Sequence, residues 1–167
     1  MNIEFKNATL HNLNEIMDVI KTAIKNMNQN NIPQWDALYP TRENFKDDIT
    51  KGYLHIGMVD SKIAVVYAVN KECDEAYKNG EWKSHDGKFC VIHRLCVNPH
   101  FQNQGIARKT LEHIEETQRK RGVKSIRLDV FSKNPYALKL YAHFGYEKVG
   151  EAEWRKGLSY LMEKQLG

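Results

Sequence analysis

The pattern of apolar and polar positions is most regular between Val91 and Arg121. Apolar and β-branched residues dominate from Val91 to Val97, and Pro99 ends this run, which predicts a strand. After Gly105, a stripe of small and apolar positions recurs at helical spacing among Lys, Arg, Glu and Gln, which predicts a long amphipathic helix. The positions of this stripe are Ala107, Leu111, Ile114 and Thr117.

The turn that joins the predicted strand to the predicted helix has the composition of an anion site. Backbone N–H groups at the start of a helix have no partner inside the helix, and together with the helix dipole they attract phosphate. Gly105 permits close approach of a ligand to the backbone, and the small Ala107 leaves the next turn unobstructed. A glycine at such a turn is often only part of the turn, so the pattern alone leaves both interpretations open.

The first half of the chain contains the patterns of five further elements. These are a strand at residues 3–5, a helix after Thr9, a short helix after Thr41, and strands at 53–59 and 62–69. The first helix has a core-type stripe of Leu13, Ile16, Met17, Ile20, Ile24 and Met27. The turn Asp60–Ser61 joins the two strands, and residues 73–88 form a polar, turn-rich connection.

The second half continues with a strand at 124–131, a helix and two closing strands at 146–149 and 157–163. Asn134 suits the N-cap of that helix, Pro135 its first position and Gly145 its C-terminal cap. The order is β-α-α-β-β-β-α-β-α-β-β, which predicts an α/β fold with a central, mostly antiparallel mixed sheet flanked by helices. We expect one domain over residues 1–167.

The composition excludes several classes of protein. With 41% hydrophobic and 28% charged residues, the chain is typical of a globular protein, and no apolar run approaches the roughly 20 residues of a membrane span. The N-terminal residues lack the layout of a signal peptide, so we expect a cytoplasmic protein with no membrane partner. The net charge is only +4, and the basic cluster at residues 119–124 has no interleaved aromatic residues, which argues against a nucleic-acid partner.

The three cysteines carry no pattern of a metal site or a disulfide framework. Their number is odd, and no pair has the spacing that zinc sites use, so we expect no metal. Cys90 and Cys96 lie in the apolar run and are expected to pack as small hydrophobic residues.

Two motifs in the second half carry a family resemblance. The first is Q-x-x-G-x-A at Gln102, Gly105 and Ala107, preceded by the run I-x-R-L-x-V-x-P. The second covers residues 134–146 and reads N-P-Y-A-L-K-L-Y-A-H-F-G-Y. In this order and spacing they resemble the acetyl-CoA-binding and C-terminal segments of the GCN5-related N-acetyltransferase (GNAT) superfamily.

The resemblance implies that acetyl-CoA is the co-substrate. The pyrophosphate would lie against the backbone N–H groups of residues 103–108, and the pantetheine arm would pair with the backbone of Leu95 and Val97. The Leu95 N–H would also polarise the thioester carbonyl. Asn134 would contact the coenzyme, a role compatible with a plain N-cap. The residues expected at the coenzyme are Leu95, Cys96, Val97, Gln102, Asn103, Gln104, Gly105, Ile106, Ala107, Arg108, Asn134 and Tyr141.

The chemistry of amine acetylation calls for a base and an acid. An alkyl ammonium has a pKa of about 10.4, so a neutral amine near pH 7.4 costs about 4 kcal/mol. His93 is the candidate base, because it shares the strand parity of Leu95 and Val97, which would present it beside the thioester. The resemblance adds weight, since Val91 occupies the place where other family members carry a glutamate; the alternative is a structural strand histidine. Tyr141 matches the family tyrosine that protonates the leaving thiolate; the alternative is a core tyrosine.

The acceptor is the least defined part of the hypothesis. Trp35 and Tyr39, in the loop between the first two helices, and Trp82 would line its pocket, or would only pack. A small amine is the expected acceptor. A protein N-terminus, a longer acyl donor and a non-catalytic acyl-CoA sensor remain as alternatives. Homodimers are frequent in the superfamily, and the sequence identifies no interface.

Overall fold

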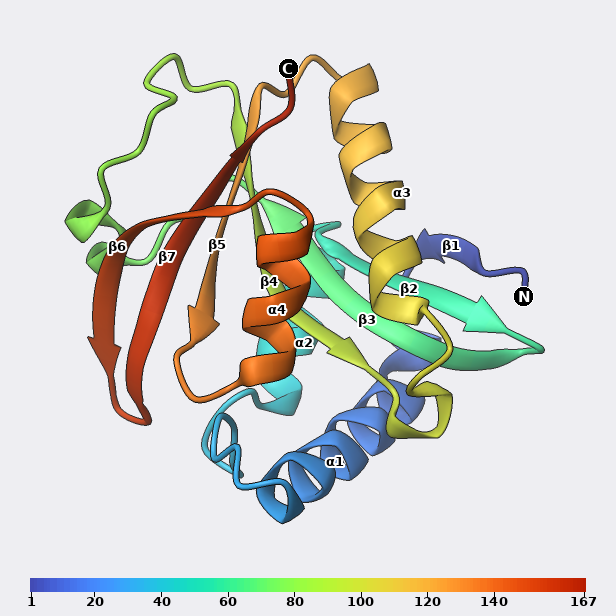
Figure 1. The fold of residues 1–167 in the computed structure, drawn as a ribbon. Helices are drawn as coiled ribbons and strands as arrows, with labels where there is room; N and C mark the ends of the chain where they lie inside the picture. Colours follow the sequence, from blue (N-terminus) through green and yellow to red (C-terminus); the bar gives the residue numbers. More distant parts are fainter. The chain divides into compact units, whose positions relative to one another are not determined.

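The computed structural model describes all residues from Met1 to Gly167, which Figure 1 draws as a ribbon. The chain forms two compact units. The first unit comprises residues 1–69 and 94–111, and the second comprises residues 70–93 and 112–167. Two elements run through both units, the strand β4 (Phe89–Val97) and the helix α3 (Ile106–Lys120). The chain contains seven strands and four α-helices, which confirms the mixed α/β class.

The first unit contains three antiparallel strands in the order β1 (Glu4–Asn7), β2 (Leu54–Val59) and β3 (Lys62–Asn70), whose last residue already belongs to the second unit. The predicted two-residue turn is present, with φ of 49° at Asp60 and 65° at Ser61. Two successive residues in the left-handed region match the right-handed twist of the strands and therefore close a tight hairpin.

The helices of the first unit pack their apolar stripes into its core. They are α1 (Leu13–Gln29) and α2 (Arg42–Thr50), and Thr41 caps α2 as predicted. Thr9 is the N-cap of a short 3-10 helix, η1 (Leu10–Asn12), and not of α1 as predicted, whose N-cap is Asn12. The Thr9 amide donates to Asn12 Oδ1 at 2.8 Å. The buried core includes Leu13, Ile16, Ile20, Phe45, Leu54, Ile56, Ile63 and Val66.

The second unit has strands in the order β4, β5 (Ser125–Phe131), β7 (Gly157–Gln165) and β6 (Glu147–Trp154). The β4 and β5 strands are parallel, and the remaining pairs are antiparallel. Strand β6 is longer than the predicted 146–149. It lies at the end of the strand order and half of its residues are exposed. Its sequence therefore lacks the alternation of apolar and polar positions that would have predicted a longer strand.

The helix α4 (Pro135–His143) begins as the sequence predicts. The Asn134 side chain accepts a hydrogen bond from the Ala137 amide at 3.1 Å, and Pro135 is the first helical residue. Gly145, with a φ of 89°, follows the helix in the left-handed conformation that favours glycine. The connection at residues 73–88 contains one 3-10 helix, η2 (Glu75–Asn79).

The helix α3 has a buried carboxylate that the periodicity did not predict. Glu115 Oε1 accepts from Lys164 Nζ at 2.6 Å, and its Oε2 accepts from the Tyr146 hydroxyl at 3.1 Å. The apolar periodicity of the helix places the residue after Ile114 at the edge of the polar face, where a glutamate is expected to be exposed. Its partners come from β7 and from the residue after Gly145, and no local pattern indicates them.

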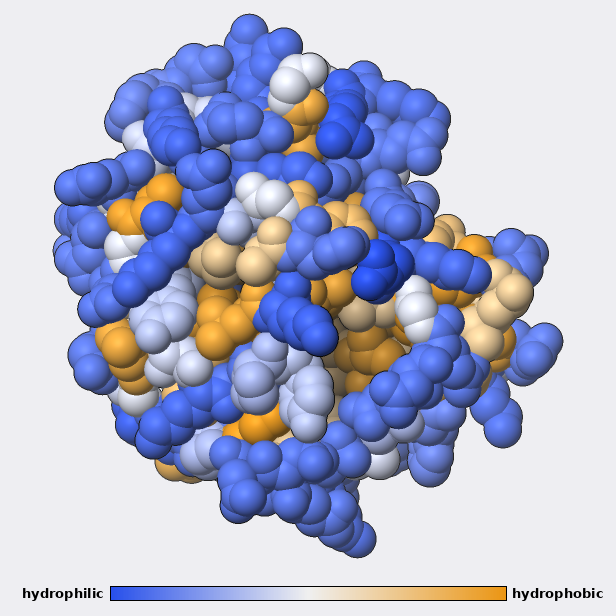
Figure 2. Space-filling model, in the orientation of Figure 1, coloured by the Kyte–Doolittle hydropathy of each residue, from blue (hydrophilic) through white to orange (hydrophobic).

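The outer surfaces of α1 and α3 are mostly hydrophilic in the view of Figure 2, as their amphipathic patterns predict. No helix combines the length and the apolar character that crossing a membrane requires.

Candidate functional site

The strand β4 has an irregular backbone at its centre. Arg94 has a φ of 53°, which is uncommon for a residue with a Cβ and costs conformational energy. The simple alternation of faces that would relate His93 to Leu95 is interrupted at this residue. The relation between the candidate base and the candidate carbonyl-polarising amide therefore does not follow from strand parity.

Side-chain bonds within the first unit hold Arg94 in place. Its Nε and Nη2 donate to the two carboxylate oxygens of Asp48 on α2 at 2.8 and 2.7 Å, and its Nη1 donates to the Tyr39 hydroxyl oxygen at 3.1 Å. The side chains of Arg94 and Asp48 are only 15% and 5% exposed. Burial disfavours the guanidinium charge, but the bonds to Asp48 and Tyr39 outweigh burial and raise the pKa of Arg94.

The turn from β4 to α3 has the conformation expected of an anion-binding loop. After the 3-10 helix η3 (Pro99–Phe101), Asn103 and Gly105 take φ values of 60° and 77°. The hydrogen bonds of α3 begin with the Lys109 amide, which donates to the Gly105 carbonyl at 3.0 Å. The amides of Ile106 and Ala107 precede this bond and so have no acceptor within the helix.

Asn98 anchors the start of this turn. Its Nδ2 donates to the Ile63 carbonyl at 2.9 Å, its Oδ1 accepts from the His100 amide at 3.0 Å, and its own amide donates to the Ala64 carbonyl at 2.8 Å. We did not single out Asn98 from the sequence, although an Asn before Pro99 is a known signal for a turn.

Three exposed motif residues follow, Gln102, Asn103 and Gln104. Gln102 donates from Nε2 to Asn26 Oδ1 near the end of α1, at 3.1 Å. Ile106 is buried and holds the helix start in the core, whereas Arg108 is exposed. Arg108 therefore adds a solvent-accessible positive charge within the first turn of α3.

The Nε2 ring nitrogen of the candidate base His93 has a defined hydrogen-bond partner. Its Nε2 lies 2.7 Å from Oδ1 of Asn70, at the end of β3. The Glu72 amide donates to the same Oδ1 at 2.8 Å, which identifies that atom as the amide oxygen. In neutral His93, Nε2 must therefore carry the proton and Nδ1 the lone pair. No sequence pattern connects residue 70 to residue 93.

The candidate acid Tyr141 lies on α4 and is 7% exposed. Its ring meets the ring of Tyr146 edge-on, with centroids 5.5 Å apart. Burial, with a smaller contribution from the Asp129 charge, raises the pKa of Tyr141 above its ordinary value of 10. The hydroxyl therefore keeps its proton at neutral and mildly alkaline pH.

The cysteines of β4 are buried as predicted. Burial raises the pKa of both Cys90 and Cys96 to about 12, so neither forms a thiolate near neutral pH. Leu95 and Val97, on either side of Cys96, are half-buried.

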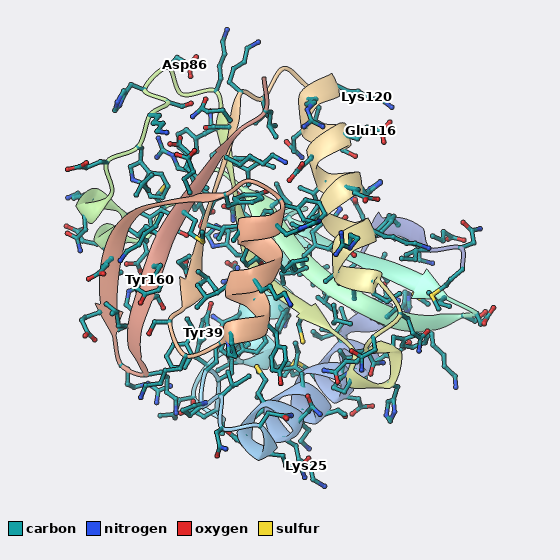
Figure 3. All side chains as sticks on the ribbon, viewed as in Figure 1. Lys25, Tyr39, Asp86, Glu116, Lys120 and Tyr160 are labelled. Atoms are coloured by element: carbon teal, nitrogen blue, oxygen red, sulfur yellow. The ribbon has the colours of Figure 1, made fainter.

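The three aromatic candidates for the acceptor pocket differ in exposure. Trp35 is buried in the core of the first unit. Trp82 is buried in the second unit and donates from Nε1 to the Tyr77 carbonyl at 2.7 Å. Tyr39 alone is exposed, at 40%, and Figure 3 labels it in the loop between α1 and α2.

Each unit, taken by itself, contains a distinct set of groups. The first unit supplies an N-terminal helix turn for an anion, together with the Tyr39, Asp48 and Arg94 cluster. The second supplies a tautomerically defined histidine and a buried, protonated tyrosine. Anion binding, proton acceptance and proton donation are the functions that acyl transfer to an amine uses.

Comparisons with known proteins give several matches. The chain is 35% identical over 59 residues to the ribosomal protein bS18-alanine N-acetyltransferase of Escherichia coli (strain K12). These 59 residues make up 35% of this chain and 40% of that protein. It is 30% identical over 94 residues to a protein of Bacillus subtilis subsp. natto described as a probable spermine N(1)-acetyltransferase, covering 53% and 54% of the two chains. The matches thus span about half or less of these curated relatives.

A solved structure and a family profile cover more of the chain. The crystal structure of a GNAT-family acetyltransferase from Streptococcus agalactiae 2603 superposes with a TM-score of 0.87 and 24% identity, over 98% of this chain and 95% of that one. That likeness demonstrates the shared fold. The profile of the acetyltransferase (GNAT) family matches residues 34–146, a range that contains both sequence motifs. On this match, which covers more than half of its length, the chain belongs to the GNAT family of acetyltransferases.

Proposed function

We propose that the protein transfers the acetyl group of acetyl-CoA to a primary amine by direct attack, with a small amine as acceptor. The observation that carries the proposal is the family match over residues 34–146, which includes the helix-start turn and the α4 tyrosine. The two curated relatives are named for the acetylation of an alanine and of spermine, both amines.

The coenzyme is assigned to the turn before α3 and to the end of β4. Pyrophosphate would accept hydrogen bonds from the amides around Ile106 and Ala107, in the field of the helix N-terminus and of Arg108. The pantetheine amides would pair with the backbone of Leu95 and Val97. Acetyl-CoA supplies the activated acetyl group, and the Leu95 N–H would stabilise the oxyanion that forms on its carbonyl.

In the proposed reaction, the amine nitrogen attacks the acetyl carbon and the carbon–sulfur bond breaks. His93 accepts the proton that the amine loses, at Nδ1, because Nε2 is held as a donor to Asn70. Tyr141 donates its hydroxyl proton to the departing thiolate, and its raised pKa keeps that proton available. The electron pair of the broken carbon–sulfur bond stays on the sulfur, which takes the proton of Tyr141, while the proton of the amine goes to His93. No covalent enzyme intermediate is needed, in keeping with the poorly ionised thiols of Cys90 and Cys96.

A protein N-terminus is the second candidate acceptor, favoured by the relative named for acetylating ribosomal protein bS18. A sensor that binds acyl-CoA without turnover is the third. It would have no use for a base of fixed tautomer or for a protonated buried tyrosine, so the groups at His93 and Tyr141 favour an enzyme.

The proposal is tested by measuring release of the CoA thiol from acetyl-CoA with purified protein. The acceptors should span polyamines, amino acids, arylalkylamines, aminoglycosides and short peptides with free N-termini. Release stimulated by one class, with one acetylated amine formed per CoA, is the expected result. Binding of acetyl-CoA without stimulated release for every class would overturn the enzymatic proposal in favour of a sensor.

A further inference from the structure

The strand β4 contains one residue whose backbone does not fit a strand. Arg94 has a φ of 53°, in the left-handed region that is unfavourable for a residue with a Cβ. Such a conformation persists only where the surrounding structure fixes it. The peptide unit after Arg94 is planar, so the dihedral angles of Arg94 set the direction of the Leu95 N–H. Whatever fixes Arg94 therefore also aims this amide.

The carboxylate of Asp48 on α2 is the main partner of Arg94. Its Oδ2 accepts from Arg94 Nε at 2.8 Å and its Oδ1 accepts from Arg94 Nη2 at 2.7 Å. Two parallel bonds between planar groups define a single relative orientation. The two side chains are 15% and 5% exposed, so little water competes for these bonds. The guanidinium is consequently held in one position.

The helix α2 in turn holds Asp48 in place. Phe45 lies one turn earlier on the same face and is completely buried. The Thr41 hydroxyl oxygen accepts from the Asn44 amide at 3.2 Å at the start of the helix, and the Asp48 carbonyl accepts from the Tyr53 amide at 2.8 Å beyond its end. The carboxylate is therefore carried by a helix that is anchored at both ends.

The stability of the fold does not by itself account for this ion pair. Taking two charges out of water is unfavourable, and replacing a buried ion pair by apolar residues is often neutral or stabilising. The neighbouring Asp47 has the ordinary arrangement, exposed and paired with Lys51 at 3.0 Å. The distinctive consequence of the Asp48 pair is geometric, because it fixes a backbone conformation that Arg94 would otherwise avoid.

We propose that Asp48, acting through Arg94, is a positioning residue that aims the Leu95 N–H at the thioester carbonyl of acetyl-CoA. Neither side chain has to touch the coenzyme, because the effect passes through the backbone of residue 94. The inference deepens the proposed function and rests on it, since that function assigns the carbonyl to the Leu95 amide. The contacts that carry the inference all lie within the first unit.

The test compares two double variants that lose the same ion pair. Asp48→Ala/Arg94→Ala and Asp48→Ala/Arg94→Gly both remove the two charges together, so neither protein retains a buried charge without its partner. The two proteins differ by one methyl group at residue 94. Glycine adopts a positive φ about as readily as a negative one, whereas alanine resists it. Asp47→Ala, on the exposed face of α2, is the matched control and should keep the wild-type kcat.

The alanine double variant should have a kcat about 5- to 30-fold below that of the glycine double variant, which corresponds to the unfavourable left-handed conformation of a residue with a Cβ. The affinity for CoA should be the same in both proteins, because CoA has no acyl carbonyl. Equal kcat values in the two double variants would overturn the inference, since the conformation of residue 94 would then have no effect on the reaction.

The stretching frequency of the thioester carbonyl gives a readout that needs no turnover. A hydrogen bond from the Leu95 N–H weakens the C=O bond and lowers this frequency. Infrared spectra of bound acetyl-CoA, isotopically labelled in the acetyl carbonyl, should show the lowered frequency in the wild-type protein and the glycine double variant, and a higher one in the alanine double variant. If this difference appears while no amine is turned over, the proposed reaction fails and the positioning role stands. If amines are turned over and the three frequencies agree, the inference fails alone.

Discussion

Replacing Tyr141 by Phe tests the assignment of the proton donor. The side chain is 7% exposed and its ring meets Tyr146 edge-on, so phenylalanine keeps the packing and removes one oxygen. A hydrogen bond from tyrosine to a developing thiolate is charge-assisted, and such bonds contribute about 1.5–3 kcal/mol. With about 1.4 kcal/mol for each factor of ten, kcat should fall by about 10- to 100-fold. The affinity for acetyl-CoA should hardly change.

The pKa of Tyr141 adds a second requirement. Burial raises this pKa above 10, so the hydroxyl is protonated at every pH below its ordinary titration range. The ratio of wild-type to Tyr141→Phe kcat should therefore stay constant between about pH 7 and pH 9.5. A ratio that declined within this window would mean that the tyrosine loses its proton there.

The assay is CoA thiol release at saturating acetyl-CoA and acceptor, with a direct measurement of acetyl-CoA affinity for each variant. Tyr160→Phe, an equivalent change on β7, is the control and should keep the wild-type kcat. An unchanged kcat in Tyr141→Phe would remove Tyr141 from the mechanism. A loss of acetyl-CoA affinity equal to the loss of rate would assign it to binding.

Three further variants test other parts of the structure. Asn70→Asp places a carboxylate at the histidine that it contacts, so the acidic limb of kcat/KM against pH should move up by about one unit; an unmoved limb would contradict the base assignment. Gly52 and Gly105 have φ values of 76° and 77° with open space around them, so replacing either by Ala should lower the free energy of unfolding in urea by about 1 kcal/mol. Only Gly105→Ala should also weaken the binding of acetyl-CoA. Glu115→Ala leaves the half-buried Lys164 and the buried Tyr146 without their carboxylate partner and should cost about 2–3 kcal/mol in unfolding free energy. Glu116→Ala, on the exposed face of α3, should leave the unfolding midpoint unchanged, and equal effects of the two variants would refute the network.

The elements that sequence predicted best carry a local signal. The hairpin at Asp60–Ser61 and the start of α4 at Asn134 depend on residues within one turn, whose backbone preferences act regardless of distant contacts. The polar strand β6 was predicted too short, because its stability comes from pairing with β7 rather than from its own pattern.

The sequence predicted which residues belong to the candidate site, but it did not predict the contacts between them. The motif spacing identified the turn at Gly105, and the structure adds that this glycine is in the left-handed region. The contacts of Arg94 with Asp48 and of His93 with Asn70 join residues that are 46 and 23 positions apart. Periodicity describes one element at a time and contains no information on such pairs.

The central claim is direct transfer of an acetyl group from acetyl-CoA to an amine. The most direct measurement uses acetyl-CoA labelled in the acetyl group, with the protein and the acceptor that best stimulates thiol release. We predict that the label appears on the amine in equal amount to the CoA released, and that protein incubated without acceptor carries no covalent label after denaturation. Label held covalently by the protein and passed on when acceptor is added would contradict direct attack, and release of CoA without a labelled amine would contradict acetyl transfer.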